Sequence, residues 1–163
     1  MRIGFIGLGN VGFKLANSLI SAGHNIYVHD LEKNNANNLI KSGAEWIKSP
    51  KELATISDIA ITCLPSPSAV ADVVEGPNGL VHGMSEGKVW IEMSTTDSKE
   101  MLRLGTIMEK IGVHCCEAPV SGGCHRAATG NIAILVGGSR TAFDLAFPAV
   151  SYTHLRAHET VDY

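Results

Sequence analysis

The chain has 163 residues, of which 45% are hydrophobic and 18% charged, a composition typical of a globular domain with a core of its own. Its formal net charge of −3 provides no basic field, so neither nucleic acid nor an anionic membrane is expected as a partner. Strand-like residues follow Met1 directly and no run of about 18 apolar residues occurs, which predicts a cytoplasmic protein without a signal peptide or a membrane span.

Short apolar segments alternate with segments of helical period along the chain. Strands are expected at about 2–6, 26–29, 44–47, 59–64, 88–92, 112–117 and 132–136. This alternation predicts a doubly wound α/β fold with a mostly parallel sheet. No linker or internal repeat divides residues 1–150, which we expect to form one domain.

A glycine-rich turn follows the first expected strand and opens a helix, within "IGFIGLGNVGFKLANSL". Gly7, Gly9 and Gly12 have the spacing in which the first glycine permits a tight turn, the second lets the backbone approach a pyrophosphate and the third permits close helix packing. The surrounding strand and helix favour a Rossmann-like dinucleotide-binding domain. A tight turn that binds nothing is the alternative.

The second expected strand ends in Asp30, 18 residues after Gly12. A carboxylate at this place accepts hydrogen bonds from the ribose hydroxyls of the adenosine and repels a 2′-phosphate. No arginine follows in "DLEKNN", so we expect NAD to be preferred over NADP. Lys14, in the first turns of the helix, is expected either to reach toward phosphate or to lie on a solvated face.

The four cysteines, Cys63, Cys115, Cys116 and Cys124, show no C-x-x-C spacing. Cys115 and Cys116 are adjacent, so they point to opposite faces if they lie on a strand. We expect buried, reduced thiols rather than a redox pair or a metal site.

Four stretches of the chain resemble the β-hydroxyacid dehydrogenases, whose best-known member is 3-hydroxyisobutyrate dehydrogenase. They are "GFIGLGNVG", "CLPSP", "IEMSTTD", and "EAPVSGG" followed by "TGNIAILVGG", and they run from residue 3 to about 147. The resemblance implies hydride transfer between NAD and a short 3-hydroxy acid such as 3-hydroxyisobutyrate. A tartronate, glyoxylate or succinic semialdehyde reductase has the same motifs and stays an alternative, as does a non-catalytic dinucleotide-binding module.

The resemblance also assigns the residues of the site. It places the cofactor against Gly7, Leu8, Gly9, Asn10, Val11, Gly12, Asp30, Leu64, Pro65 and Thr95, and the carboxylate of a small-molecule substrate against Ser121, Gly122 and Gly123. A hydroxyl and closely spaced backbone N–H groups at a helix start form an anion-binding concavity, although "SGG" also describes a plain turn with an N-cap. Ala69 stands where the family often has an asparagine, which removes one polar contact to the cofactor.

The proton acceptor of the family is a lysine beyond the dinucleotide-binding domain, at the entry to an all-helical second domain. The eight lysines of this chain all lie within residues 1–110, and none has that context. We therefore expect no catalytic residue in this chain, doubtful activity of the chain alone, and a homo-oligomer for a full-length protein. His125 lies near the expected substrate segment, as a contact or surface residue rather than a proton relay.

Residues 151–163, "SYTHLRAHETVDY", do not continue the family pattern. They resemble the translation of a sequencing adapter, and we expect a non-native or disordered tail. His154 and His158 are four residues apart, but no motif places the third protein ligand that catalytic zinc needs. We expect no metal site.

Overall fold

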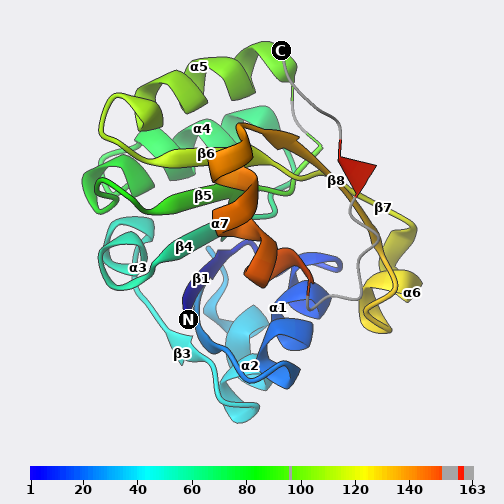
Figure 1. Cartoon of the computed structure of the whole chain (residues 1–163). Coiled ribbons are helices and arrows are strands. Elements are labelled where there is room, and N and C mark those ends of the chain that lie inside the picture. Colours follow the sequence, from blue (N-terminus) through cyan, green and yellow to red (C-terminus); the bar gives the residue numbers. More distant parts are fainter. Residues whose placement is uncertain (96, 152–157, 160–163) are drawn as a thin grey trace.

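The computed structural model describes residues 1–95 and 97–151 together with the backbone of residues 158–159 (Figure 1). Its centre is a twisted sheet of parallel strands in the order β3-β2-β1-β4-β5-β6. The strands are β1 (Arg2–Ile6), β2 (Asn25–His29), β3 (Glu45–Trp46), β4 (Ile59–Thr62), β5 (Val89–Glu92) and β6 (His114–Glu117). The strand order reverses between β1 and β4, and ligands of open α/β sheets bind at such a point, beyond the carboxyl ends of the strands.

The sheet continues past β6 with antiparallel strands. β8 (Ala133–Gly138) pairs antiparallel with β6 and with β7 (Val120–Ser121), and β9 (His158–Glu159) pairs parallel with β8. The doubly wound, mostly parallel sheet is as expected, whereas β7 was not expected, because two residues are too few to show a strand period. Residues 152–157 and 160–163 of the tail, His154 included, lie outside the described residues, so the expectation of a non-native or disordered tail stays a prediction.

Helices cover both faces of the sheet. One face packs against α1 (Gly12–Ser21), α2 (Asn37–Lys41), α6 (Gly123–Ala128) and α7 (Arg140–Ser151), and the other against α3 (Pro50–Ile56), α4 (Pro67–Glu75) and α5 (Ser98–Glu109). Short 3-10 turns lie at η1 (Lys33–Ala36) and η2 (Leu80–His82). No helix in the described part of the chain is long and apolar enough to cross a membrane.

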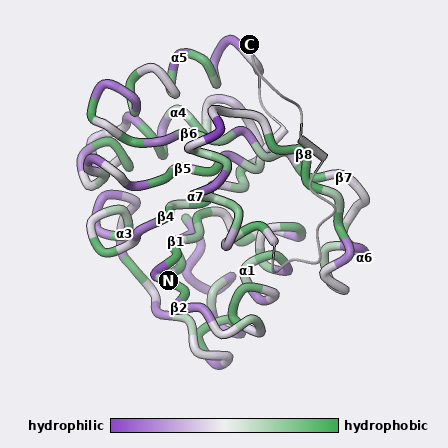
Figure 2. The backbone as a smooth tube through the Cα atoms, viewed as in Figure 1, coloured by the Kyte–Doolittle hydropathy of each residue, from purple (hydrophilic) through white to green (hydrophobic). Residues whose placement is uncertain are grey.

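The core consists of two hydrophobic clusters, one on each side of the sheet. Phe5 and Leu15 belong to the cluster under α1 and α7, and Trp90 and Leu53 to the cluster under α3, α4 and α5. The outer helices are amphipathic, as the alternating colours along α5 show in Figure 2. Burial of both sheet faces explains why the central strands are almost continuously apolar.

The adjacent cysteines of β6 belong to different clusters, as strand alternation predicts. Cys116 is buried in the cluster under α1 and α7, whereas Cys115 packs against the cluster on the other face. Burial raises the pKa of both thiols to about 12. Both are therefore neutral near pH 7, as expected of cysteines that serve as core residues.

Local sequence signals explain where α3 and α4 begin. Ser49 and Ser66 are the N-caps, and their hydroxyls accept the backbone N–H of Glu52 and Ala69, at 3.2 Å in both helices. Each cap is followed by a proline, whose missing N–H costs nothing in the first helical turn. The β4–α4 connection that carries Leu64 is thus held at its far end by a capped helix.

Candidate dinucleotide-binding cleft

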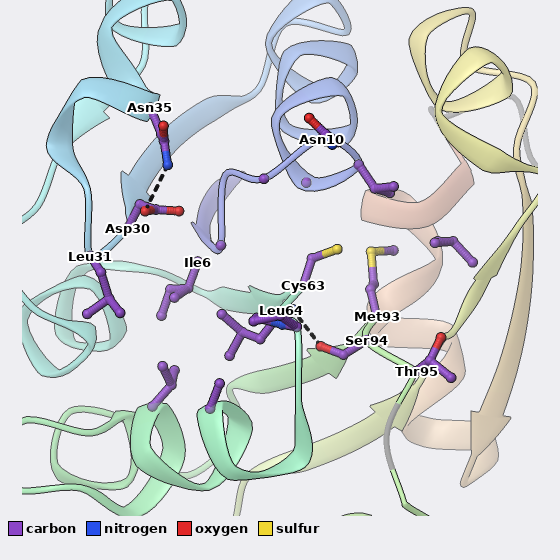
Figure 3. Close-up of a pocket in the computed structure, with 18 of the residues that line it drawn as sticks. Ile6, Asn10, Asp30, Leu31, Asn35, Cys63, Leu64, Met93, Ser94 and Thr95 are labelled. Carbon is purple, nitrogen blue, oxygen red and sulfur yellow. Dashed lines mark hydrogen bonds between the residues drawn. The ribbon is translucent and has the colours of Figure 1, made fainter.

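A cleft of about 670 Å³ lies at the carboxyl ends of β1, β2, β4 and β5, where the strand order reverses (Figure 3). The volume lies within the range of about 300 to 1,000 Å³ that is usual for small-molecule sites. Of the residues expected in the site, the lining includes Gly7, Gly9, Asn10, Val11, Gly12, Asp30, Leu64, Pro65, Thr95 and Gly123. Segments far apart in the sequence thus form one concave surface.

The three glycines of the turn have different structural roles. Gly7 has a φ of +95°, and a Cβ on it would collide with the carbonyl oxygen of Cys63. A Cβ on Gly12 would collide with the carbonyl oxygen of Gly7, so the fold itself requires both glycines. A Cβ on Gly9 would have nothing within 4 Å, and Gly9 lines the cleft. The absence of a side chain at Gly9 leaves room for a ligand rather than for the protein.

Asp30 is held rigidly at one end of the cleft. Its Oδ1 accepts the backbone N–H of Glu32 at 2.8 Å and the side-chain amide of Asn35 at 3.1 Å. Its Oδ2 accepts the backbone N–H of Leu8 at 2.7 Å, which ties the carboxylate to the glycine-rich turn. Among the described residues Leu8 is the one donor to Oδ2, so a lone pair of that atom is left for a ligand hydroxyl.

Leu31 gives the cleft an apolar surface beside Asp30, whereas Lys33 and Lys14 make contacts outside the cleft lining. Leu31 lines the cleft with 96% of its surface exposed, and the apolar Val73 of α4 is also among the lining residues. The ammonium group of Lys33 lies 5.8 Å from the centre of the Trp46 ring. Lys14 donates to the carbonyl oxygen of Cys124 at 3.0 Å, so it joins α1 to α6 and fits neither of its two expected roles.

A chain of hydrogen bonds lies beneath the opposite end of the cleft. The Trp90 indole N–H donates to Thr62 Oγ1 at 2.9 Å, and the Thr62 hydroxyl donates to Glu92 Oε2 at 2.5 Å. Glu92 Oε1 accepts the backbone N–H of Ser94 at 2.5 Å, and Ser94 Oγ accepts the backbone N–H of Leu64 at 2.7 Å. This series of hydrogen bonds therefore connects the turn after β4 to the loop after β5.

Sequence reasoning did not single out Glu92, although an acidic residue inside the apolar strand "VWIE" was a visible signal. Burial raises the pKa of its carboxyl, hydrogen bonds from Ser94 and Thr62 lower it, and the nearby charge of Glu117 raises it further. Cys63 and Met93, also missed, line the cleft with their sulfur atoms (Figure 3). Burial, with the charge of Glu92, raises the pKa of Cys63 to about 11, so this wall is neutral near pH 7.

The expected substrate segment lies only partly at the cleft. Gly123 lines it, whereas Ser121 and Gly122 are exposed beside it and do not, and His125 is exposed on α6. Gly122 and Gly123 have φ values of +128° and +73°, a region that favours glycine. Leu8 is buried and lines a neighbouring groove rather than the cleft. The assignment of a carboxylate to Ser121, Gly122 and Gly123 stays a prediction.

Metal-ligating side chains are scattered in this structure. Within residues 1–95 and 97–151, no group of three or more His, Cys, Asp or Glu side chains is arranged to hold a metal ion. The cleft instead offers backbone N–H groups at the start of α1, a fixed carboxylate and apolar walls. This donor set suits a dinucleotide, whose pyrophosphate, ribose hydroxyls and rings need those three kinds of partner.

Comparison with known proteins agrees with this geometry. A family model described as the NAD binding domain of 6-phosphogluconate dehydrogenase matches residues 2–153. A relative from Dictyostelium discoideum, named "Probable 3-hydroxyisobutyrate dehydrogenase, mitochondrial", is 38% identical over 144 residues, which are 88% of this chain and 45% of that protein.

Solved structures show the same fold. The Mycobacterium tuberculosis 3-hydroxyisobutyrate dehydrogenase with L-serine superposes with a TM-score of 0.86 at 27% identity, over 93% of this chain and 51% of that one. Psf3 in complex with NADP+ and 2-OPP gives a TM-score of 0.90 at 26% identity, over 97% of this chain and 57% of that one. The chain thus spans about half the length of its relatives, and it belongs to the family of NAD-binding domains of 3-hydroxyisobutyrate dehydrogenase-like oxidoreductases.

Proposed function

We propose that this chain binds NAD and forms the cofactor-binding part of a dehydrogenase for a short 3-hydroxy acid such as 3-hydroxyisobutyrate. The observation that carries the proposal is the carboxylate of Asp30, fixed by Leu8, Glu32 and Asn35 beside the glycine-rich turn. The names of the Dictyostelium relative and of the M. tuberculosis structure support the substrate class. A bound dinucleotide supplies the hydride acceptor, and the protein supplies its position and surroundings.

The residues of the cleft suggest which end of a dinucleotide each would hold. The start of α1 at Gly12, with Gly9 open beside it, suits the pyrophosphate. Asp30 suits the ribose of the adenosine, and the exposed Leu31 suits one face of the adenine ring. The nicotinamide would then lie toward Thr95, beside Gly123 and the expected carboxylate-binding segment.

We further propose that NAD is preferred over NADP. A 2′-phosphate would lie against the Asp30 carboxylate, with which it shares its sign of charge. Two nearby lysines have other contacts, since Lys33 lies over the Trp46 ring and Lys14 donates to the carbonyl of Cys124. The cost of an uncompensated charge pair corresponds to at least a roughly tenfold difference in affinity.

Titration of the 163-residue chain with NADH and with NADPH, followed by nicotinamide fluorescence, tests the proposal. NADH should bind at least about tenfold more tightly, and Asp30→Ala should reduce this ratio toward one because the repulsive charge is removed. Asp30→Asn is the matched control, because its amide oxygen can still accept a hydrogen bond while the charge is lost. Equal or tighter binding of NADPH by the wild-type chain would refute the preference.

The proton acceptor of the reaction is proposed to come from another part of a longer protein. This chain spans about half of its relatives, and the cleft has no lysine among its lining residues within the described part of the chain. His125 is exposed outside the lining, so it is not placed to take a proton from a substrate in the cleft. The residues of the cleft bind and orient the cofactor and the substrate.

A further inference from the structure

Glu92 is a buried carboxyl group that the binding of a dinucleotide does not explain. Its side chain has no exposed surface, and it is absent from the lining of the cleft. Among the described residues, Ser57, Thr62, Glu92 and Ser94 are the buried polar and charged ones, and all but Ser57 belong to the hydrogen-bonded chain that starts at Trp90. Buried polar groups are therefore concentrated directly beneath one end of the cleft.

The register of the sheet brings this chain of hydrogen bonds together. Thr62 of β4 lies opposite Glu92 of β5, and both are the last residues of their strands. The carboxylate therefore accepts the hydroxyl of Thr62, the residue opposite it at the end of β4, and the backbone N–H of Ser94, two residues past the end of β5. Both segments that it orders, the turn at Leu64 and the loop at Ser94, line the cleft.

Ser94 makes the two segments into one unit. Its backbone N–H donates to Glu92. Its hydroxyl oxygen accepts the N–H of Leu64, as the dashed line between these two residues in Figure 3 marks. The Leu64 turn in turn abuts the glycine-rich turn, because the carbonyl of Cys63 lies where a Cβ on Gly7 would be. Movement of Ser94 would therefore displace the floor of the cleft at the end away from Asp30.

We infer that Glu92 is a positioning residue, which sets the Leu64 turn and the Ser94–Thr95 loop in the place needed by the nicotinamide half of the cofactor. This inference rests on the proposed function. The adenosine half depends on Asp30 and Leu31. The hydrogen-bond partners of Asp30 are Leu8, Glu32 and Asn35, none of which belongs to the series of hydrogen bonds around Glu92. Loss of the Glu92 carboxyl should therefore affect the two halves of the cofactor unequally.

The test compares binding of NADH with binding of ADP-ribose, which has the adenosine and pyrophosphate but no nicotinamide. In the 163-residue chain, Glu92→Ala and Thr62→Val should weaken NADH about tenfold and reduce the enhancement of nicotinamide emission. Affinity for ADP-ribose should stay within about twofold of wild type. Both affinities are measured by titration, ADP-ribose by calorimetry.

Two conservative variants are the controls. Glu92→Gln keeps an oxygen that can accept the Ser94 N–H, and its amide group can donate to Thr62 Oγ1. The Thr62 hydroxyl can then donate to the carbonyl oxygen of Ile91, which lies 3.5 Å away. Thr62→Ser keeps the hydroxyl. Both should bind NADH as the wild-type chain does, which a general loss of packing around Glu92 would not predict.

Each other result counts against a specific statement. Unchanged NADH affinity and emission in Glu92→Ala and Thr62→Val would overturn the positioning role, and so would an equal loss of NADH and ADP-ribose. If circular dichroism shows that Glu92→Ala does not fold, the NADH affinity of Thr62→Val decides whether Glu92 has the positioning role, because valine matches threonine in shape. If neither variant folds, the role of Glu92 is structural and the inference is overturned. A wild-type chain that binds ADP-ribose but not NADH, or neither, refutes the proposed function itself.

Discussion

Gly9 and Gly12 belong to the same motif, yet a methyl group at each has a different effect. At Gly12 a Cβ would collide with the carbonyl oxygen of Gly7, so Gly12→Ala should destabilise the turn and lower the midpoint of thermal unfolding by several degrees. At Gly9 a Cβ meets no protein atom, so Gly9→Ala should unfold within about 2 °C of the wild type.

Binding separates the two glycines further. Gly9→Ala should lose most of its NADH affinity, since its methyl group would occupy the space that a pyrophosphate needs. Thermal unfolding and NADH titration on the same samples check both statements. Normal NADH binding by Gly9→Ala would show that the backbone at Gly9 does not approach a ligand.

The buried carboxyl of Glu92 should make stability depend on pH. Because burial raises its pKa in the folded state, the folded protein holds this proton more tightly than the unfolded chain does. The resulting stabilisation is fully present below the unfolded pKa of about 4.3 and is lost as pH rises through the higher folded pKa. Glu92→Gln has no such proton to lose.

Urea unfolding of the wild type and of Glu92→Gln at a series of pH values from about 4 upward measures this effect. The free energy of unfolding of the wild type, minus that of the variant, should fall as pH rises. Glu86→Gln, at an exposed glutamate, is the matched control for the loss of one negative charge. A difference that rises with pH would mean that hydrogen bonds to Glu92 outweigh its burial.

The sequence was informative about residues whose role follows from local spacing. The three glycines and Asp30, which local spacing singles out, line one cleft, because a motif between one strand and one helix keeps its geometry in any α/β sheet. Their contacts to a cofactor stay a prediction. Glu92 and Ser94 could not be assigned in this way. Their partners, Thr62 and Leu64, are about 30 residues away, and only the register of β4 and β5 brings them together.

The helix cap at α3 should contribute to stability without any effect on the cleft. Ser49→Ala removes the acceptor for the Glu52 N–H and should cost about 1 kcal/mol of unfolding free energy, measured by urea denaturation. Ser49→Asn, which can cap equally well, should stay close to wild type. NADH affinity should be unchanged in both, because Ser49 does not line the cleft.

Elements were predicted well where burial gives a clear pattern and poorly where tertiary pairing decides. The strand expected at about 59–64 ends at Thr62, since the N–H of Leu64 bonds to Ser94 Oγ instead of a neighbouring strand. β7 exists because Val120 and Ser121 meet the edge of β8, a pairing that two residues alone do not indicate.

The whole molecule corresponds to one part of its relatives. The match over residues 2–153 agrees with the expected dinucleotide-binding fold, and the boundary expected at residue 150 stays a prediction. Composition and motifs did not identify the side chain of the substrate or the oligomeric state, because neither property follows from local spacing along the sequence.

The reversal of strand order has a consequence for motion. β1 to β3 form one half of the sheet and β4 to β6 the other, and the pairing of β1 with β4 is the seam between them. A dinucleotide that spans the cleft would contact both halves of the sheet and so stabilise the pairing at this seam.

Amide hydrogen exchange can detect this stabilisation, because the exchange rate of an N–H group reports how often its region of the protein opens. The N–H of Cys63, which donates across the seam to the carbonyl of Ile6, should exchange more slowly when NADH is bound. The N–H of Leu135, which donates to Pro119 at the far edge of the sheet, should exchange at the same rate with and without NADH. In this protein a bound cofactor would therefore stabilise the pairing of β1 with β4 on which it lies, in addition to supplying the hydride acceptor.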